Sequence, residues 1–331
     1  MRRQYQIVVP SGKTRERLDL FLTKAIENAT RKKVQDAIKS GQVLVNNKLS
    51  KASYKILPLD VINVTLQKTQ SQEIIPENIP LNIVYEDKYL IVIDKPAGMV
   101  THPAFGNYSG TLVNALLFHC RGQLAGMDNI VRAGIVHRLD KDTSGLLVIA
   151  KDDITHAKLA KQFFQRTVDR EYWAIVWGNF KKIKSGIVEA NLGRSKSNRK
   201  KITVIENGKN AITEYEVIKN FDYVSLIKLK LRTGRTHQIR VHLHHIGHPV
   251  FGDPIYGGRK IVYGSGSRRN KEQIQILLDI MKRQALHART LGFIHPKTNK
   301  KLKFHSKLPE DMKEVLSILK DIESDSFESL Q

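Results

Sequence analysis

Residues 133–150 read Ala-Gly-Ile-Val-His-Arg-Leu-Asp-Lys-Asp-Thr-Ser-Gly-Leu-Leu-Val-Ile-Ala. Two apolar, strand-like runs here flank a short polar loop that holds Asp140 between Arg138 and Lys141. Nearby positive charge favours the ionised carboxylate, which suits a nucleophile or a charge-stabilising base better than a general acid. The same loop could equally be an Asx-type turn with solvated charges, so the residues alone leave both interpretations open.

On either side of this loop, the predicted strands and helices are mixed without regular alternation. Apolar or alternating runs predict strands at residues 81–85, 89–93, 145–150, 171–177, 212–218 and 224–231, and helical spacing predicts helices at 112–119 and 154–165. This order favours an α+β fold with a mixed or antiparallel sheet over a doubly wound sheet. Residues 181–201, with a net charge of +7, and the glycine-rich residues 257–271 are predicted to be loops. Residues 319–331 are predicted to be a frayed acidic tail.

Residues 1–70 are predicted to form a separate small α/β unit. Helical spacing predicts one helix over residues 18–26 and a second that Thr30 caps and Gly41 closes, with strands at 43–45 and 61–64. From Arg2 to Lys68 there are 14 basic and 5 acidic residues, so the unit presents a basic face. The polar residues 71–80, with Pro76 and Pro80, are predicted to link it to a larger domain at 81–318.

The whole chain is strongly basic. Its 331 residues include 55 Lys and Arg against 32 Asp and Glu, a formal charge of +23. Nucleic acid is the partner that such a balance most often indicates, although a basic surface also serves solubility. No apolar run is long enough for a membrane span or a signal peptide, and a single cysteine excludes an intrachain disulfide. We therefore expect a cytoplasmic protein that does not contact a membrane.

A second basic motif occupies residues 231–245. We expect Thr236 to cap a helix with Ile239 inward and Arg240 on the opposite face. The first amides of this helix, together with Arg235, would make an anion site for phosphate or for Asp140. The pairs His242 with His245 and His244 with His248 have chelating spacings, but no Glu or Cys lies between them, so we favour no metal site. In the strand at 171–177, Tyr172 and Trp173 point to opposite faces, and we expect Trp173 in the core.

The stretch His137-Arg-Leu-Asp140-Lys-Asp-Thr-Ser-Gly145 resembles the signature of RluA-type pseudouridine synthases. Further motifs follow in the family's order between residues 80 and 310: Asp94-Lys-Pro-Ala-Gly98, Arg170-Glu-Tyr172, Thr233-Gly-Arg-Thr-His-Gln-Ile-Arg-Val-His242 and Gly252-Asp-Pro-Ile-Tyr-Gly257. The N-terminal unit resembles an S4 RNA-binding domain through Arg17-Leu-Asp19, Thr30-Arg31 and Val43-Leu-Val-Asn46. Asn47 and Leu59 stand where that domain usually has glycine, and Asn tolerates a left-handed turn.

The resemblance, closest to the RluD-like branch, implies isomerisation of uridine to pseudouridine in large-subunit ribosomal RNA by base flipping. It implies that Asp140 is the catalytic carboxylate, Arg235 its basic partner and Tyr172 the aromatic residue that stacks on uracil. Arg138 and His137 would hold the substrate RNA, and Arg31, Lys32 and Lys33 would bind RNA in the S4 unit. One glycosidic bond is exchanged for another, so no cofactor is expected, and nothing demands more than a monomer.

Two other functions remain compatible with the residues. A non-catalytic RNA-binding or assembly factor on the same fold would retain RNA but form no pseudouridine. A metal-dependent nuclease would cleave RNA until a chelator stopped it, but only Asp140 and Asp142 supply carboxylates near the basic motifs.

Overall fold

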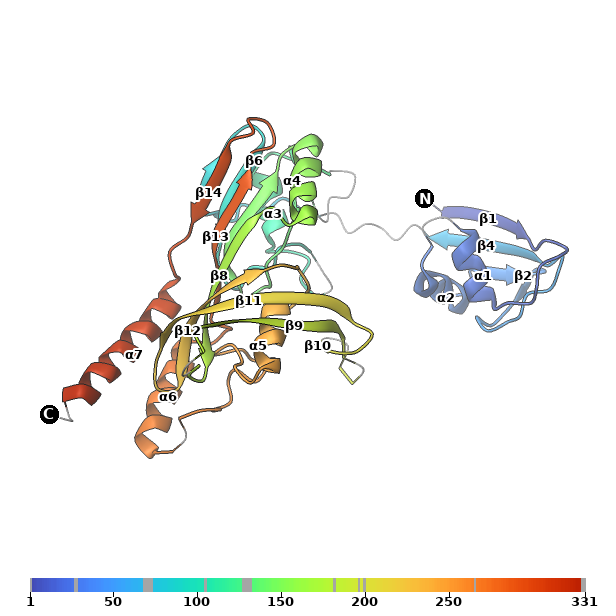
Figure 1. Ribbon diagram of the computed structural model, residues 1–331. Coiled ribbons are helices and arrows are strands. Elements are labelled where there is room, and N and C mark those ends of the chain that lie inside the picture. Colours follow the sequence, from blue (N-terminus) through green and yellow to red (C-terminus); the bar gives the residue numbers. More distant parts are fainter. Residues whose placement is uncertain are drawn as a thin grey trace. The chain divides into compact units, whose positions relative to one another are not determined.

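The computed structural model describes residues 2–26, 29–67, 74–103, 106–126, 133–180, 183–195, 197–198, 201–264 and 266–328. The chain divides into two compact units, Met1–Glu73 and Ile74–Gln331 (Figure 1). None of the helices in the described part of the chain combines the length and the apolar character that a membrane crossing requires.

The smaller unit packs two helices on a four-stranded antiparallel sheet. Its elements are β1 (Arg2–Val8), α1 (Leu18–Ala25), α2 (Arg31–Lys39), β2 (Val43–Val45), β3 (Lys48–Leu49) and β4 (Val61–Gln67), with strand order β1-β4-β2-β3. Leu18, Leu22, Val34 and Ile62 lie in its core, and the Thr30 side chain accepts the N–H of Lys33 to cap α2 as predicted. Strand β1 was not predicted, because charged and polar residues outnumber apolar ones in it.

Both residues that replace the usual glycines of this unit adopt left-handed backbone angles. Asn47 has φ 61° and Leu59 has φ 69°. The neighbouring Asp60 is buried and accepts hydrogen bonds from Asn46 Nδ2, the Tyr54 hydroxyl and the Leu57 N–H. The turn therefore keeps a conformation suited to glycine, held by Asp60, although a leucine occupies it.

The larger unit is built on a ten-stranded mixed sheet. Its strands are β5 (Ile83–Glu86), β6 (Leu90–Lys95), β7 (Ser144–Ala150), β8 (Asp169–Trp177), β9 (Ser185–Arg194), β10 (Ile202–Val204), β11 (Lys209–Asn220), β12 (Val224–Leu231), β13 (Leu286–Ile294) and β14 (Lys301–His305). The order is β10-β9-β11-β12-β8-β13-β7-β6-β5, with β14 beside β13. β13 and β7 pair in parallel and the other neighbours are antiparallel, which agrees with the predicted α+β class.

Every residue of strand β7 is buried. The helices of the larger unit are α3 (Leu112–His119), α4 (Asp153–Gln165), α5 (Gln238–His245), α6 (Arg268–Ile280) and α7 (Glu310–Glu328). Leu147 and Ile149 of β7 join one hydrophobic cluster, which includes residues of α3, and Leu146 and Val148 join a second, which includes Leu159 of α4. A strand covered on both faces reads as a continuous apolar run. The polar loop that contains Asp140 is thus attached to the most buried strand of the sheet.

Two predicted loops are partly regular structure. Within residues 181–201, β9 runs from Ser185 to Arg194 and pairs with β11; residues 181, 182, 196, 199 and 200 lie outside the described residues. Within residues 257–271, α6 begins at Arg268, and a Cβ on Gly258 would meet the Val250 carbonyl oxygen at 1.8 Å. The charge of residues 181–201 conceals β9, because only Val188 and Leu192 of this strand are buried. The glycine content of residues 257–271 conceals the start of α6.

Both predicted ends of the larger domain are also wrong. Residues 74–80 pack on the larger unit rather than linking it: Ile74 is buried in its core, and the Glu77 carboxylate accepts the N–H of Gly110. Residues 71–73 lie outside the described residues. The predicted tail continues α7 as far as Glu328, with Leu319 buried beside Leu316, and residues 329–331 lie outside the described residues. The apolar spacing of α7 therefore continues through residue 319, where the acidic tail is predicted to begin.

Candidate active site

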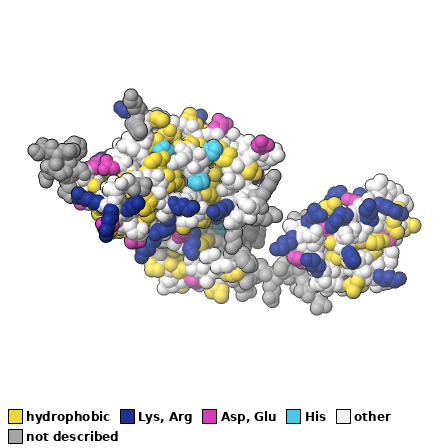
Figure 2. Space-filling model, turned by 90° about the horizontal axis from the view of Figure 1, so that it is seen from below, with side chains coloured by type: hydrophobic (Ala, Val, Ile, Leu, Met, Phe, Trp, Pro, Cys, Tyr) yellow, Lys and Arg dark blue, Asp and Glu magenta, His cyan; other side chains and the backbone are white. Residues whose placement is uncertain are grey.

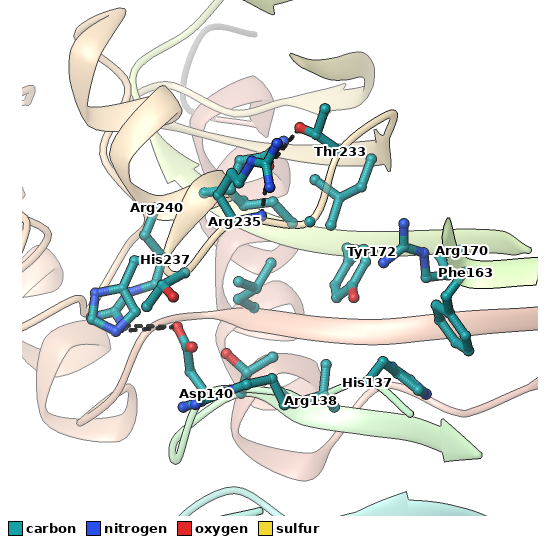
Figure 3. Close-up of a pocket in the computed structure, with 18 of the residues that line it drawn as sticks. His137, Arg138, Asp140, Phe163, Arg170, Tyr172, Thr233, Arg235, His237 and Arg240 are labelled. Carbon is teal, nitrogen blue, oxygen red and sulfur yellow. Dashed lines mark hydrogen bonds and ion pairs between the residues drawn. The ribbon is translucent and has the colours of Figure 1, made fainter. Parts of the chain in front are cut away.

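A cavity of about 470 Å³ in the larger unit brings the two basic motifs together. It is lined by the loop that precedes β7, the end of α4, the start of β8, the end of β12 and the segment that enters α5. In Figure 3, Arg138 and Asp140 come from the first of these segments, Tyr172 from β8, His237 from the segment that enters α5, and Arg240 from the first turn of α5. The polar loop that contains Asp140 is therefore one wall of a pocket.

Asp140 is paired with a buried arginine. Arg240 Nη1 donates to Asp140 Oδ2 at 3.0 Å, and the two side chains are 4% and 19% exposed, respectively. Burial acts against the charge of Arg240, but the hydrogen bonds and charge of Asp253, with a smaller contribution from Asp140, raise the pKa of its guanidinium above the ordinary value. The cation beside Asp140 is thus permanent, and it offsets the negative charge of a partly enclosed carboxylate.

Asp253 fixes the position of this arginine. Its carboxylate is fully buried and accepts Arg240 Nε at 2.6 Å and Nη2 at 2.9 Å. The same carboxylate accepts the N–H groups of Ile255 and Tyr256, so the turn after Asp253 orients it. A bidentate pair of this kind restricts both position and rotation. It leaves Nη1 of Arg240 directed at Asp140.

His237 is the second group that faces Asp140. Its Nε2 lies 3.8 Å from Asp140 Oδ2, and its Nδ1 lies 2.8 Å from the Tyr256 hydroxyl, which also accepts the N–H of Ile202. Burial lowers the pKa of His237, opposed by the charge of Asp140. A neutral ring whose Nδ1 accepts from Tyr256 presents its Nε2–H toward Asp140.

The expected pairing of Arg235 with Asp140 is wrong. Helix α5 begins at Gln238 with His237, not Thr236, as its N-cap, and His237 takes a left-handed conformation with φ 55°. This start carries Arg240 inward, contrary to the outward face expected for it. Arg235 lies before the helix, is exposed, donates from Nε to the Asn210 carbonyl and sits near Thr233 in Figure 3. It still lines the pocket. The two carboxylates that Arg240 contacts, Asp140 and Asp253, lie in two other motifs of the sequence. No pattern within one motif shows that the three residues meet.

The remaining predicted residues of the larger unit also line the pocket. Tyr172 is buried, and burial raises the pKa of its hydroxyl, which stays protonated at neutral pH. His137 accepts the Val148 N–H at Nε2 and stacks on Phe163 at 4.4 Å; burial lowers its pKa to about 3, so it is a neutral wall rather than a phosphate-binding cation. Arg138 is exposed. Trp173 is only half-buried, with the Arg289 guanidinium 3.7 Å from its ring centroid, so its predicted place in the core is wrong.

The predicted RNA-binding residues of the smaller unit occupy the first turn of α2. Arg31, Lys32 and Lys33 are exposed there, and Arg31 Nε also donates to Asp19 Oδ2. Figure 2 shows Lys and Arg side chains spread over the visible face of this unit, with few acidic ones among them. Within the described residues, no group of three or more His, Cys, Asp or Glu side chains is placed to hold a metal ion.

Known proteins match both units. Residues 89–245 match the RNA pseudouridylate synthase family, and residues 16–62 match the S4 domain. An uncharacterized RNA pseudouridine synthase of Chlorobaculum parvum is 47% identical over 95% of this chain and 97% of its own length. The ribosomal large subunit pseudouridine synthase D of Zymomonas mobilis is 44% identical over 92% of this chain and 93% of its own length. The structure of human RNA pseudouridylate synthase domain containing 4 is 26% identical, with a TM-score of 0.55 over 72% of this chain and 93% of that one. The chain therefore belongs to the RNA pseudouridine synthase family and carries an S4 domain before its catalytic unit.

Proposed function

We propose that this chain converts specific uridines of large-subunit ribosomal RNA to pseudouridine, with Asp140 as the catalytic carboxylate. The observation that carries the proposal is a partly open carboxylate beside a fixed arginine and across a pocket from a buried tyrosine. The choice of RNA is supported by similarity over nearly the whole chain to proteins named as large-subunit enzymes, such as that of Zymomonas mobilis.

In this proposal, the target uridine leaves its stack and enters the pocket. The bond between uracil N1 and the sugar C1′ breaks, the ring turns, and a bond between C5 and C1′ forms, while C5 loses a proton and N1 gains one. Asp140 acts on the anomeric carbon or on the ring. Arg240 takes the role first expected of Arg235, and Tyr172 packs on the uracil. Because substrate and product are isomers, the reaction balances without ATP or a redox cofactor.

The surrounding cations would bind RNA without reading its sequence. Arg138 and Arg235 are exposed at the pocket, and the smaller unit adds the basic first turn of α2. Contacts of this kind recognise phosphate, so affinity should fall steeply with salt. We place residues 1–73 as the RNA-binding unit and residues 74–331 as the catalytic unit of a cytoplasmic monomer that acts on ribosomal RNA, free or in a precursor particle.

The test is to delete the gene in its source organism and map pseudouridines in ribosomal RNA. We expect defined large-subunit sites to disappear and to return with the wild-type gene, but not with Asp140→Asn. Asp142→Asn is the matched control, because Asp142 is two residues away and does not line the pocket; it should restore the sites. Unchanged pseudouridines after deletion, or restoration by Asp140→Asn, would contradict the proposal.

A further inference from the structure

Two adjacent phenylalanines at the end of α4 face different surroundings. Phe163 points into the pocket wall, where it stacks on His137 and lies 5.5 Å from the Arg170 guanidinium (Figure 3). Phe164 is 87% exposed, yet it also lines the pocket. A large aromatic ring that buries so little of its surface contributes little to the fold. It is therefore available to a ligand at the mouth of the pocket.

The pocket around Phe164 is strongly cationic. Arg138, Arg166, Arg170 and Arg235 line it, and among the described residues Asp140 is the one acidic side chain in the lining. Within the described part of the chain, none of these four arginines forms an ion pair with a carboxylate. An exposed aromatic ring among unpaired arginines is complementary to a nucleotide, which offers a flat base and a phosphate.

Arg166 has a backbone conformation that an arginine rarely adopts. It ends α4 with φ 62° and ψ 29°, the left-handed position that helices usually give to glycine. Its side chain is exposed and lines the pocket beside Phe164. A long cationic residue where glycine would relieve the backbone is consistent with a functional constraint on its side chain.

We propose that Phe164 and Arg166 form a subsite for one unpaired nucleotide next to the target uridine, with its base stacked on Phe164 and its phosphate bound by Arg166. The inference rests on the proposed function, because a uridine inserted into the pocket brings its chain neighbours to the mouth. The stacking tolerates any base, so this subsite supplies affinity and register rather than sequence reading.

The test is a binding cycle in the Asp140→Asn background, which prevents turnover. The RNAs are an unstructured 11-nucleotide strand with one central uridine and two copies that have an abasic residue on the 5′ or the 3′ side of it. We expect Phe164→Ala to weaken binding of the intact strand about tenfold. The same change should weaken binding of one of the two abasic strands less than twofold, because that strand lacks the base that would stack on Phe164. Ile154→Ala is the matched control: Ile154 is on the same helix, 72% exposed and outside the pocket, and its loss should change no affinity. Equal effects of Phe164→Ala on all three strands would overturn the proposal.

Arg166→Gly separates a functional role from a structural one. Because glycine suits the left-handed position, this variant should unfold at a higher temperature while binding the intact strand several-fold more weakly. Unchanged affinity would overturn the role of Arg166. In otherwise wild-type enzyme, Phe164→Ala should raise the RNA concentration for half-maximal turnover by a factor similar to the loss of binding. Absence of pseudouridine formation by the wild-type chain would instead refute the proposed function, whatever these variants bind.

Discussion

Each unit of the chain holds an aspartate that is paired with arginine, but the two carboxylates differ in their burial and in the number of side chains that donate hydrogen bonds to them. Asp19 in α1 is fully buried and accepts hydrogen bonds from Arg17, Arg31 and Gln35 at 2.6–3.1 Å. These bonds, those of Arg17 foremost, hold the pKa of Asp19 well below its ordinary value. Asp140 is partly open to its pocket, and among the described side chains Arg240 supplies its hydrogen bond.

The exposure of the arginines is reversed. Arg17 and Arg31 are 41% and 51% exposed, so in the smaller unit the carboxylate is enclosed and its partners reach into solvent. Arg240 is buried and held by Asp253, so in the larger unit the arginine is fixed and the aspartate remains accessible. A saturated carboxylate organises structure, whereas an unsaturated one beside a fixed cation is available for chemistry.

The largest change in stability is expected for Asp253→Asn. It removes the counter-charge of a buried arginine, which should lower the free energy of unfolding of the larger unit by about 3–5 kcal/mol. Arg240 would also lose its orientation, so the rate at saturating RNA should fall more than about tenfold while RNA affinity changes little. Denaturant unfolding and single-turnover kinetics measure the two effects, with Asp142→Asn as control. If a folded Asp253→Asn enzyme kept the wild-type rate, Asp253 would not orient Arg240 for the reaction.

The corresponding change in the smaller unit is Asp19→Asn. The loss of charged hydrogen bonds should lower the free energy of unfolding of this unit by about 2 kcal/mol. The loss is smaller than for Asp253→Asn, because the freed arginines are partly exposed and water can hydrate them. Hydrogen exchange of α1 and α2 amides in the full chain measures the loss. The rate of chemistry at saturating RNA should not change, and a slower chemical step would show that the two aspartates do not divide structure and catalysis as we describe.

Acidification should separate the two units. All twelve histidines lie beyond residue 73, and burial lowers the pKa of His242 and of His287 to about 4. Between that value and the unfolded value of about 6.5, the unfolded chain binds more protons, so stability falls as pH falls. At pH 5, His242 alone should cost the larger unit about 2 kcal/mol relative to pH 7. The depressed pKa of Asp19 stabilises the smaller unit until pH falls through the range of an ordinary carboxyl.

The measurement is hydrogen exchange at pH 7 and pH 5, resolved by unit. Amides of the larger unit should lose protection first, and His242→Leu should reduce that loss. Two results would contradict the view that buried neutral histidine causes the loss of stability at low pH. The first is opening of the smaller unit before the larger one at pH 5, and the second is an unchanged pH dependence in His242→Leu.

The smallest expected effect concerns strain in the two units. Leu59→Gly should stabilise the smaller unit by about 0.5–1 kcal/mol, because glycine accepts the positive φ. The reciprocal control is Gly41→Ala. Gly41 has φ 72°, so a side chain at this position should lower the free energy of unfolding of the smaller unit. RNA affinity should be unaffected by Leu59→Gly, in contrast to Arg166→Gly at the pocket. A loss of RNA affinity with Leu59→Gly would mean that strain in the smaller unit is also functional.

Local patterns predicted the parts of the fold that local patterns control. The apolar run of β7, the spacing of α4 and the Thr30 cap are set by neighbours in sequence, and the structure agrees with them. β13 was not predicted, and its buried His287 makes a hydrogen bond with Ser144 on β7, 143 residues away in the sequence. No pattern along one segment reveals such a partner.

The site divides in the same way. The segments that hold Asp140 and Tyr172 could be predicted as a loop and a strand from local pattern, but residue type left Asp140 open between a turn and a site, and the family resemblance assigned both residues to the site. Arg240 could not be assigned, since its burial depends on Asp253 in a separate turn and on the left-handed start of α5 at His237. The exposure of Phe164 depends on how α4 packs against its neighbours.

The most direct test of this division is tritium release from large-subunit ribosomal RNA transcripts that contain [5-³H]uridine, measured in single turnover with saturating enzyme. Release reports loss of the C5 proton, so it follows the isomerisation itself. The account predicts that the wild type and Asp19→Asn release tritium at the same rate, whereas Asp140→Asn, although folded and able to bind RNA, is at least about 10³-fold slower. Release by Asp140→Asn within tenfold of the wild-type rate would contradict it.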